Sequence, residues 1–338
     1  GHRLSARNQL EKAPTYDKLK SSGAFSEELL AKLMAGISAR QYKATVIKAA
    51  EAFGVSSGSV SRHFVKASAK KLKEFVERDL STFLPFAIML DTVHRGGVAF
   101  IVALGIDTKG KKKVLGFWEG ATENSTITLK LIEDLERRNL PLSSQVLFIT
   151  DGGSGVIKAL KDKFGTQLIH QRCTIHKDRN IQRHLAKKYR DTAHDKFKKA
   201  LAHTSYKDAK AELLKLERWL RGINPSAANS LLEALEEILT LHKLRVPEEL
   251  RRVLSTTNGI ENLFSTTRHR EKNLKNYNPK YNGKPTKSGL SQRWLATVFI
   301  NAESGFRTVK GFESIPGVIN NIKKIHQELF DNENKVAA

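Results

Sequence analysis

Three short apolar runs, followed by alternating helices and strands, constrain the fold of this chain more than any other feature. The runs are rich in β-branched and aromatic residues and are separated by Arg-Gly-Gly and Thr-Lys-Gly-Lys turns, a pattern typical of antiparallel strands. After them the sequence predicts a helix over Ser125–Arg138, a strand in QVLFIT, a helix over about Ser154–Lys163 and a strand in QLIHQ. The three runs are FAIMLDTV, GVAFIVALGID and KKVLGFWEG. The chain is therefore predicted to be an α/β protein.

This order of elements is that of an RNase H-like fold. In such a fold the first strand is central and the fourth lies beside it, so Asp91 and Asp151 are expected to meet. Between Lys177 and Leu254 no strand pattern remains, and helical periodicity predicts an all-helical insertion that interrupts this core. We therefore expect a helical domain in 1–80, the first part of the core in 81–176, the insertion in 177–255, and the second part of the core with C-terminal helices in 256–338.

The N-terminal helical domain carries a pattern that resembles a helix-turn-helix. KATVIKAAEAF predicts one helix, GVS a turn at Gly54, and SGSVSRHFVKA a second helix. The outward face of this second helix includes Ser59, Ser61 and Arg62, which are candidates for contacts in a DNA major groove. The alternative is an ordinary three-helix bundle without DNA contact.

The charge of the chain favours the DNA interpretation. The sequence has 58 Lys and Arg residues against 35 Asp and Glu residues, a formal net charge of +23, and phosphate is the matching counter-charge. No uncharged apolar run approaches the roughly 20 residues of a membrane span. A single cysteine, Cys173, excludes an intramolecular disulfide, and no signal peptide is visible. We therefore expect double-stranded DNA as the partner, no membrane association and a cytoplasmic location.

Three acidic residues are candidates for a catalytic metal site. Asp91 and Asp151 each lie at the end of an apolar strand pattern, and Glu261 opens a helical stretch. Carboxylates in this arrangement can hold two Mg²⁺ or Mn²⁺ ions about 4 Å apart, which suits phosphodiester chemistry. Each residue also has an ordinary interpretation, as a turn or cap residue for the two aspartates and as a first-turn helix carboxylate for Glu261. The three together favour the metal site.

Cys173 and His176 in QRCTIH have metal-ligand spacing, but the chain has no second cysteine for a tetrahedral zinc site. A Cys-His nucleophile pair is an alternative, although residues three apart usually point into packing or toward DNA rather than at one another. A structural or DNA-positioning role is favoured. Of the three tryptophans, Trp294 lies next to a basic loop and is the candidate for stacking on a base, with core packing as the alternative.

Taken together, these motifs resemble the Mutator-type group of bacterial insertion-sequence transposases. The matching pieces follow one another in family order from about Leu90 to Phe306. They are LDTVHRGGVAFIVALGIDTKGKKKVLGFWEGATENS, FITDGGSGV, HQRCTIHKDRN and LRRVLSTTNGIENLFSTTRHR. The departures are a longer Lys/Asn-rich loop after Glu261 and an N-terminal region that matches only as a generic helix-turn-helix.

The resemblance implies an RNase H-like core with a DDE triad. Asp91, Asp151 and Glu261 would ligate the catalytic metals, Cys173 and His176 would form the family's Cys-x-x-His element, and the helical domain would be inserted before the glutamate. Arg268 matches the family's arginine on the helix of Glu261. The residues expected to contact DNA in such an enzyme are Arg172, His176, Arg179, Arg268, Arg270 and Lys272.

The expected function is that of a DDE transposase. Such an enzyme binds the terminal inverted repeats of its element, cleaves a DNA strand with metal-activated water and joins the resulting 3′-OH to a target phosphodiester. A homodimer follows from the need to hold two DNA ends. The alternatives are an RNase H-like nuclease without strand transfer and a transposase-derived DNA-binding regulator.

Overall fold

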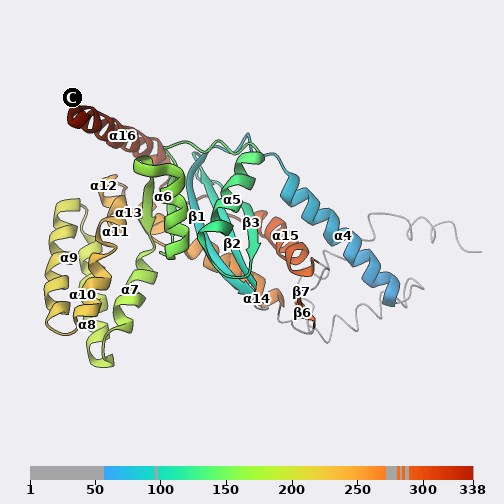
Figure 1. The fold of residues 1–338 in the computed structure, drawn as a ribbon, viewed down its shortest axis with the longest axis horizontal. Helices are drawn as coiled ribbons and strands as arrows, with labels where there is room; N and C mark the ends of the chain where they lie inside the picture. Colours follow the sequence, from blue (N-terminus) through green and yellow to red (C-terminus); the bar gives the residue numbers. More distant parts are fainter. Residues whose placement is uncertain (1–56, 96–97, 272–279, 282–283, 286–288, 338) are drawn as a thin grey trace, which may run out of the picture.

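The computed structural model describes residues 57–95, 98–271, 280–281, 284–285 and 289–337. At its centre lies a five-stranded sheet in the order β3-β2-β1-β4-β5 (Figure 1). The strands are β1 (Pro85–Arg95), β2 (Val98–Asp107), β3 (Lys112–Gly120), β4 (Leu147–Thr150) and β5 (Ile169–Arg172).

The connections explain the strand directions. Few residues separate β1, β2 and β3, and these three strands pair antiparallel. Helices α5 (Ser125–Arg137) and α6 (Ser154–Phe164) return the chain across the sheet, so β4 pairs parallel with β1, and β5 with β4. The predicted central position of the first strand and its pairing with the fourth are confirmed, and the predicted element bounds differ from these by a few residues.

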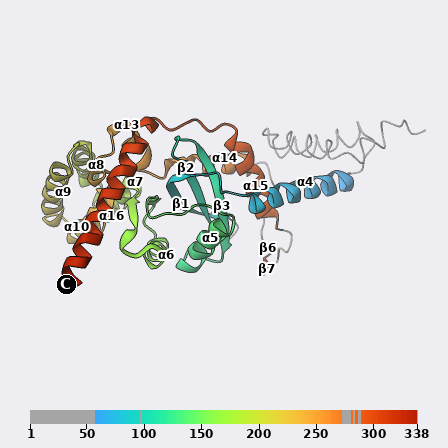
Figure 2. The ribbon, with the colours of Figure 1, turned by 90° about the horizontal axis from the view of Figure 1, so that it is seen from above.

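Apolar side chains cover both faces of the sheet. Leu131 of α5 and Leu160 of α6 join Leu90 of β1 in the cluster on one face. The opposite face is covered by α14 and α15, as Figure 2 shows, and its cluster also includes residues of α4 and α16. The bounds of these four helices are α4 (Ser57–Glu77), α14 (Asn258–Glu271), α15 (Leu290–Glu303) and α16 (Ile315–Ala337). The sheet is therefore the middle of three layers.

The second helix of the predicted N-terminal module is longer than its sequence pattern indicated. It continues as α4 to Glu77, and Phe75 near its end is fully buried in the core. The Phe75 ring stacks on that of Phe117 in β3, with 5.5 Å between centroids. Packing against the sheet therefore extends the helix, and α4 belongs in part to the core. The predicted first helix and its turn lie outside the described residues.

Trp294 lies within α15, which starts at Leu290. The Trp294 side chain is buried, with 3% of its surface exposed. The Lys/Asn-rich segment before α15, predicted as a loop, contains the short strands β6 (Lys280–Tyr281) and β7 (Lys284–Pro285), which pair antiparallel. The rest of that segment up to residue 288 lies outside the described residues.

The segment between β5 and α14 forms seven helices and no strand, as the sequence predicted for the insertion. Most of them share an apolar cluster of their own that runs from Ile181 to Leu239. Near the end of the insertion, Leu241, Leu250 and Leu254 belong instead to the cluster on the sheet face that α14 and α15 cover. In Figure 1 the insertion lies at the opposite end of the sheet from α4. The helices are α7 (Thr174–Arg183), α8 (Lys187–Ala202), α9 (Tyr206–Arg221), α10 (Pro225–Leu232), α11 (Leu235–Ile238), α12 (Thr240–Lys243) and α13 (Glu248–Leu254).

The insertion leaves the sheet and returns to it at one place. The buried Gln171 side chain in β5 donates a hydrogen bond to the Ile238 carbonyl (3.2 Å) and accepts one from the Leu241 backbone N–H (3.1 Å). The Thr240 hydroxyl donates to the His170 carbonyl at 2.5 Å. These bonds form a stem that ties β5, from which the insertion leaves, to the residues around the start of α12.

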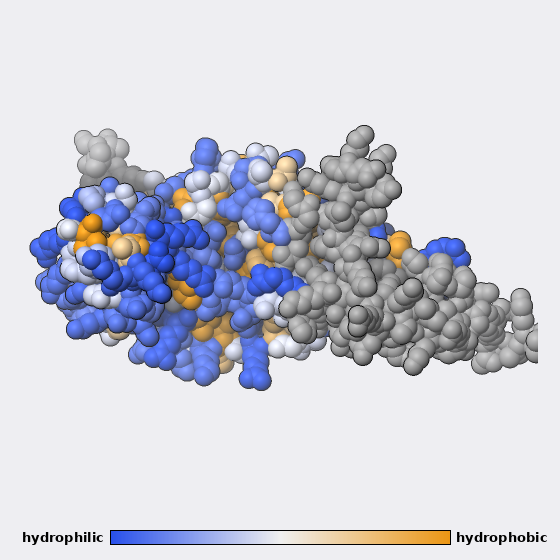
Figure 3. All heavy atoms as spheres, turned by 90° about the horizontal axis from the view of Figure 1, so that it is seen from below, coloured by the Kyte–Doolittle hydropathy of each residue, from blue (hydrophilic) through white to orange (hydrophobic). Residues whose placement is uncertain are grey.

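On the face drawn in Figure 3, hydrophilic residues predominate, and small apolar patches lie on the helical insertion and nearer the middle of the molecule. No helix of the described part of the chain is long and apolar enough to cross a membrane. The large apolar side chains exposed among the described residues are distributed over several elements: Val65, Leu84, Leu214, Leu232, Leu329 and Phe330.

Candidate active site

The two aspartates lie side by side at the edge where β1 and β4 meet. Leu90 of β1 pairs with Thr150 of β4 in a parallel ladder, and Asp91 and Asp151 are the next residues. Asp91 has 7% of its surface exposed, and its carboxylate accepts a hydrogen bond from the Thr92 backbone N–H at 2.8 Å. The Asp151 carboxylate is partly exposed and accepts from the Gly153 N–H at 3.0 Å. The parallel strand order therefore brings the two carboxylates together.

Glu261 approaches them from the first turn of α14. This helix lies close to the sheet because Gly259 has no side chain: a Cβ there would lie 3.1 Å from Leu104 and 3.2 Å from Met89. The position of Glu261 is fixed by helical bonding of its N–H to the Thr257 carbonyl at 3.0 Å. All three predicted acidic residues thus lie in one region.

The electrostatics of Asp91 show how closely the acidic groups interact. Burial, then the charge of Asp151 and, less strongly, the charge of Glu261 raise the pKa of Asp91, which is about 7. Hydrogen bonding from the Thr92 N–H and the charge of His176 act in the opposite direction. Without a cation, the cluster therefore disfavours full ionisation.

His176 is the positive group next to this cluster. Its Nε2 lies 3.5 Å from the Glu261 carboxylate. A hydrogen bond with the Cys173 thiol raises the pKa of His176 to about 8, against the effect of burial, and the charges of Cys173, Asp91 and Asp151 add to the increase. In its protonated form, which the raised pKa favours, the imidazole pairs with the Glu261 carboxylate.

Cys173 and His176 lie close enough at the start of α7 to influence each other's pKa. Cys173 is the N-cap of α7 and His176 is the third residue of the helix, and side chains at these two positions meet at a helix start. Burial acts to raise the pKa of the Cys173 thiol, but hydrogen bonding with His176 and Thr257 outweighs it and leaves that pKa below its usual range. The pair therefore orients the imidazole toward Glu261.

A fourth carboxylate, that of Glu123, also lies near Asp151 and was not predicted from the sequence. This residue precedes Asn124, the N-cap of α5, and its carboxylate oxygen occupies the place where a Cβ on Gly153 would lie. Burial and then the charge of Asp151 raise the pKa of Glu123, whereas the Thr92 hydroxyl and His94 lower it. The glycine at 153 is the sequence signal that could have indicated a close neighbour.

Apart from the half-buried His176, the predicted DNA-binding residues fall into three groups. Arg62 on α4, Arg179 on α7 and Arg268 on α14 are exposed. Arg172 and Trp294 are buried, with 6% and 3% of their surfaces exposed, so neither offers its side chain to a partner at the surface. The side chains of the remaining candidates lie outside the described residues: Ser59, Ser61, Arg270 and Lys272.

Burial of Trp294 agrees with the core-packing alternative rather than with base stacking. Arg172 is buried because its guanidinium is ion-paired with Glu233 at 2.9 Å and Glu237 at 3.4 Å, both from the helical insertion. The sequence spacing gave no indication of these partners, which lie more than sixty positions away.

Within the described residues, no three His, Cys, Asp or Glu side chains form a ready-made metal-binding group. Asp91, Asp151 and Glu261 lie in one region, but their side chains are not arranged around a common ion position. Glu261 nevertheless has one buried carboxylate oxygen without a hydrogen-bond partner. An unsatisfied buried oxygen in a group of mutually repelling carboxylates is an environment that a divalent cation would stabilise.

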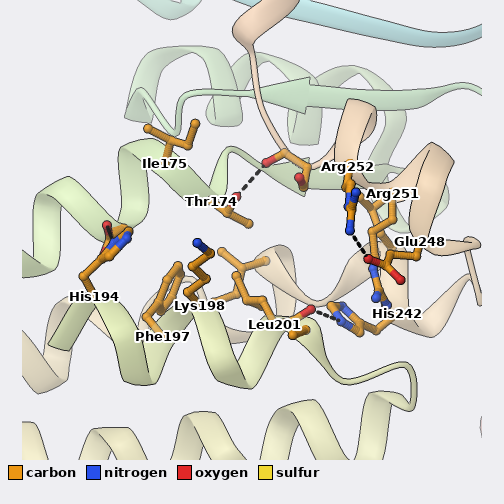
Figure 4. A pocket seen from close by; sticks show the side chains of 15 residues that line it. Thr174, Ile175, His194, Phe197, Lys198, Leu201, His242, Glu248, Arg251 and Arg252 are labelled. Carbon is orange, nitrogen blue, oxygen red and sulfur yellow. Dashed lines mark hydrogen bonds and ion pairs between the residues drawn. The ribbon is translucent and has the colours of Figure 1, made fainter. Parts of the chain in front are cut away.

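A separate cavity of about 430 Å³ lies among the helices of the insertion, bordered by α7, α8, α11, α12 and α13 (Figure 4). Phe197 and Leu201 form part of its apolar wall, and Arg251 and Arg252 lie on the opposite side. None of the three acidic residues lines it. The cavity shares α7 with the acidic site but is distinct from it.

Comparisons with known proteins identify the class. The family model described as "Transposase, Mutator family" matches residues 16–283. The chain therefore belongs to the Mutator family of transposases, and the resemblance found from its motifs is confirmed.

Similar curated proteins are transposases of bacterial insertion sequences. The chain is 29% identical to the transposase for insertion sequence element IST2 of Acidithiobacillus ferrooxidans, over 53% of this chain and 59% of that protein. It is 28% identical to the ISRM5 transposase of Rhizobium meliloti, over 74% of this chain and 63% of that protein. It is 26% identical to the IS905 transposase of Lactococcus lactis, over 85% and 71%. The chain thus spans about 60% of the length of the first of these relatives.

Proposed function

We propose that the protein is a DDE transposase with an RNase H-like core, which cleaves the ends of an insertion sequence and joins them to target DNA. The observation that carries the proposal is the placement of Asp91 and Asp151 at the ends of adjacent parallel strands, with Glu261 brought to them by a helix on the sheet. The strand order β3-β2-β1-β4-β5 supports the RNase H-like assignment. Family membership supports DNA transposition as the overall reaction.

Asp91, Asp151 and Glu261 are the residues that would hold two Mg²⁺ or Mn²⁺ ions. Their mutual repulsion, and a buried Glu261 oxygen that makes no hydrogen bond and has His176 at 3.5 Å, fit oxygen-preferring divalent cations. Bound there, the ions would supply activation of the attacking oxygen and stabilisation of the leaving one. The chain itself contributes the alignment of the three carboxylates, and protonated His176 places a positive charge beside Glu261 that suits a role in positioning the DNA end.

The net charge of +23 supports double-stranded DNA as the partner. The exposed arginines Arg62, Arg179 and Arg268 lie on three different helices and would contact phosphates along an extended duplex. We propose that residues before α4 complete a helix-turn-helix for recognition of the terminal inverted repeats. Because two ends must be held together, the working form is a homodimer.

An Asp151→Asn variant tests the proposal. The assay uses labelled element-end DNA, Mg²⁺ or Mn²⁺ and a plasmid target, and it measures end binding, strand cleavage and joined products. We expect Asp151→Asn to keep end binding and to lose cleavage and joining. The matched control is Asp107→Asn, at the opposite end of the sheet from Asp91, which should keep all three.

Three outcomes would contradict the proposal. Cleavage that survives Asp151→Asn would remove this residue from the site. Metal-dependent cleavage by the unmodified protein without any joined product would indicate a nuclease. End binding without cleavage would indicate a DNA-binding regulator.

A further inference from the structure

Arg172 connects the loop after Asp151 to the helical insertion. It is the last residue of β5, and its guanidinium donates a hydrogen bond to the Gly152 carbonyl at 3.3 Å. On its other side it donates to the carboxylates of Glu233 at 2.9 Å and Glu237 at 3.4 Å. Glu233 is the C-cap of α10 and Glu237 belongs to α11. One buried side chain therefore contacts both parts of the protein.

Gly152 allows this approach. Its φ is +100°, a conformation that residues with a side chain rarely adopt. A Cβ at this position would lie 2.7 Å from the Cζ of Arg172 and 2.8 Å from one terminal nitrogen. The absence of a side chain on Gly152 thus lets the guanidinium lie directly against the residue that follows Asp151.

A second set of contacts holds the other side of Gly152. Its N–H donates to the Thr150 hydroxyl at 3.2 Å, and that oxygen lies 2.9 Å from the Nε2 of His170. The His170 ring in turn has its Nδ1 3.8 Å from the Glu237 carboxylate. The Gly152 carbonyl is therefore linked to Glu237 by hydrogen bonds through Arg172. The Gly152 N–H is linked through Thr150 to His170, whose ring lies 3.8 Å from the Glu237 carboxylate.

Helix α10 of the insertion is also tied to α7, the helix that carries His176. Lys177, the next residue along α7, has 1% of its surface exposed and donates to the Ser230 carbonyl of α10 at 2.9 Å. Its ammonium group forms an ion pair with Glu233, the carboxylate that also binds Arg172. Glu233 therefore binds both Arg172 and Lys177, which flank Cys173 and His176 in the sequence.

We propose that Arg172 is a positioning residue, through which Glu233 and Glu237 of the helical insertion hold the loop that presents Asp151. This inference rests on the proposed role of Asp151. It assigns Arg172 to the placement of a catalytic carboxylate rather than to a DNA phosphate, because its charge is already paired in the protein interior. Small displacements of reacting groups have large effects on rate, on the order of 10²-fold for 1 Å.

The test compares Arg172→Gln with Arg251→Gln in the full chain. Arg251 is also buried and donates to a backbone carbonyl, that of His203 at 3.1 Å, but it does not contact the Asp151 loop. Element-end affinity, single-turnover cleavage rate and the Mg²⁺ concentration for half-maximal cleavage are measured. We expect Arg172→Gln to keep the affinity, to cut more slowly by about 10²-fold and to need more Mg²⁺. Arg251→Gln should leave the Mg²⁺ requirement unchanged.

Glu237→Gln provides a second variant if Arg172→Gln does not fold. It keeps Arg172 and the Glu233 contact, and we expect a smaller increase in the Mg²⁺ requirement. An unchanged requirement in a folded Arg172→Gln protein, or in Glu237→Gln if only that variant folds, would overturn the proposal. Loss of end affinity with a normal Mg²⁺ requirement would instead make Arg172 a DNA contact. Asp151→Asn is measured alongside: if it stays active, the proposed function fails, whereas an inactive Asp151→Asn with a normal Arg172→Gln refutes this inference alone.

Discussion

Replacing Asp91 by Asn should stabilise the metal-free protein, and the stabilisation should grow with pH. The pKa of Asp91 is about 7 in the folded protein, raised by burial and by Asp151, against an ordinary value of 3.8. The folded state therefore binds a proton that the unfolded state has lost between these two values. The contribution of Asp91 to stability is fully present below pH 3.8 and is lost as the pH rises through 7. Asparagine has no charge to bury and can still accept the hydrogen bond from the Thr92 N–H.

The size of the effect follows from the pKa difference. Each unit corresponds to about 1.36 kcal/mol, so the full penalty of ionised Asp91 at high pH is about 4 kcal/mol. With only 7% of its surface exposed, Asp91 is little screened by solvent. Between about pH 5.5 and pH 8, the difference in free energy of unfolding between the variant and the unmodified protein should widen by about 2 kcal/mol. This change with pH is informative because effects of the substitution that do not titrate cancel in it.

Urea unfolding of both proteins at the two pH values, with metal removed by a chelator, measures the gap. Added Mg²⁺ at the higher pH should stabilise the unmodified protein and have less effect on Asp91→Asn, since a cation offsets the repulsion that the variant has already lost. A gap that is the same at both pH values would refute the reasoning. It would mean that Asp91 is not held among interacting carboxylates in the metal-free protein.

Two further predictions concern glycine and aromatic positions. Gly152→Ala places a side chain at positive φ where Arg172 lies, and it should lower the free energy of unfolding in urea by about 1–3 kcal/mol. Gly153 has an ordinary φ of −56°, so Gly153→Ala should change stability little, but it should displace the Glu123 carboxylate and slow cleavage. Equal stability losses for the two variants would contradict the described loop. Phe75→Ala should destabilise the protein by about 3–5 kcal/mol, because the ring is fully buried against Phe117. A loss well under 1 kcal/mol would show that α4 is not anchored to the sheet.

The sheet and the two aspartates were predictable because both depend on local patterns joined by a simple connection rule. Apolar runs defined the strands, and helical returns made β4 parallel to β1, which fixed Asp91 beside Asp151. Glu261 could be placed near them only through the family resemblance, since nothing in the spacing alone determines where a helix after a long insertion returns.

Arg172 and Glu123 show why the rest could not be predicted. An arginine in a basic chain is expected to face its anionic partner, and its burial here depends on two glutamates of the insertion. Glu233 and Glu237 are four positions apart on a helical pattern and look like an ordinary solvent-exposed face. The position of Glu123 depends on the packing of α5 against α6, where a Cβ on Gly155 would meet the Asn124 backbone at 2.8 Å. Such contacts between elements leave no periodic signal.

Because Gln171, Ile238 and Leu241 form a stem, the helices between its two sides can change with little effect on the sheet. The residues at its base remain hydrogen-bonded neighbours although 67 positions separate Gln171 from Ile238. Since the closure cost of a segment rises only slowly with its length once its ends are fixed, helices between them can be lengthened, shortened or exchanged at little expense to the strands below. What such changes must preserve is the pair of glutamates near the stem. The same architecture that permits a variable insertion therefore places a fixed requirement on its segment from the end of α10 through α11.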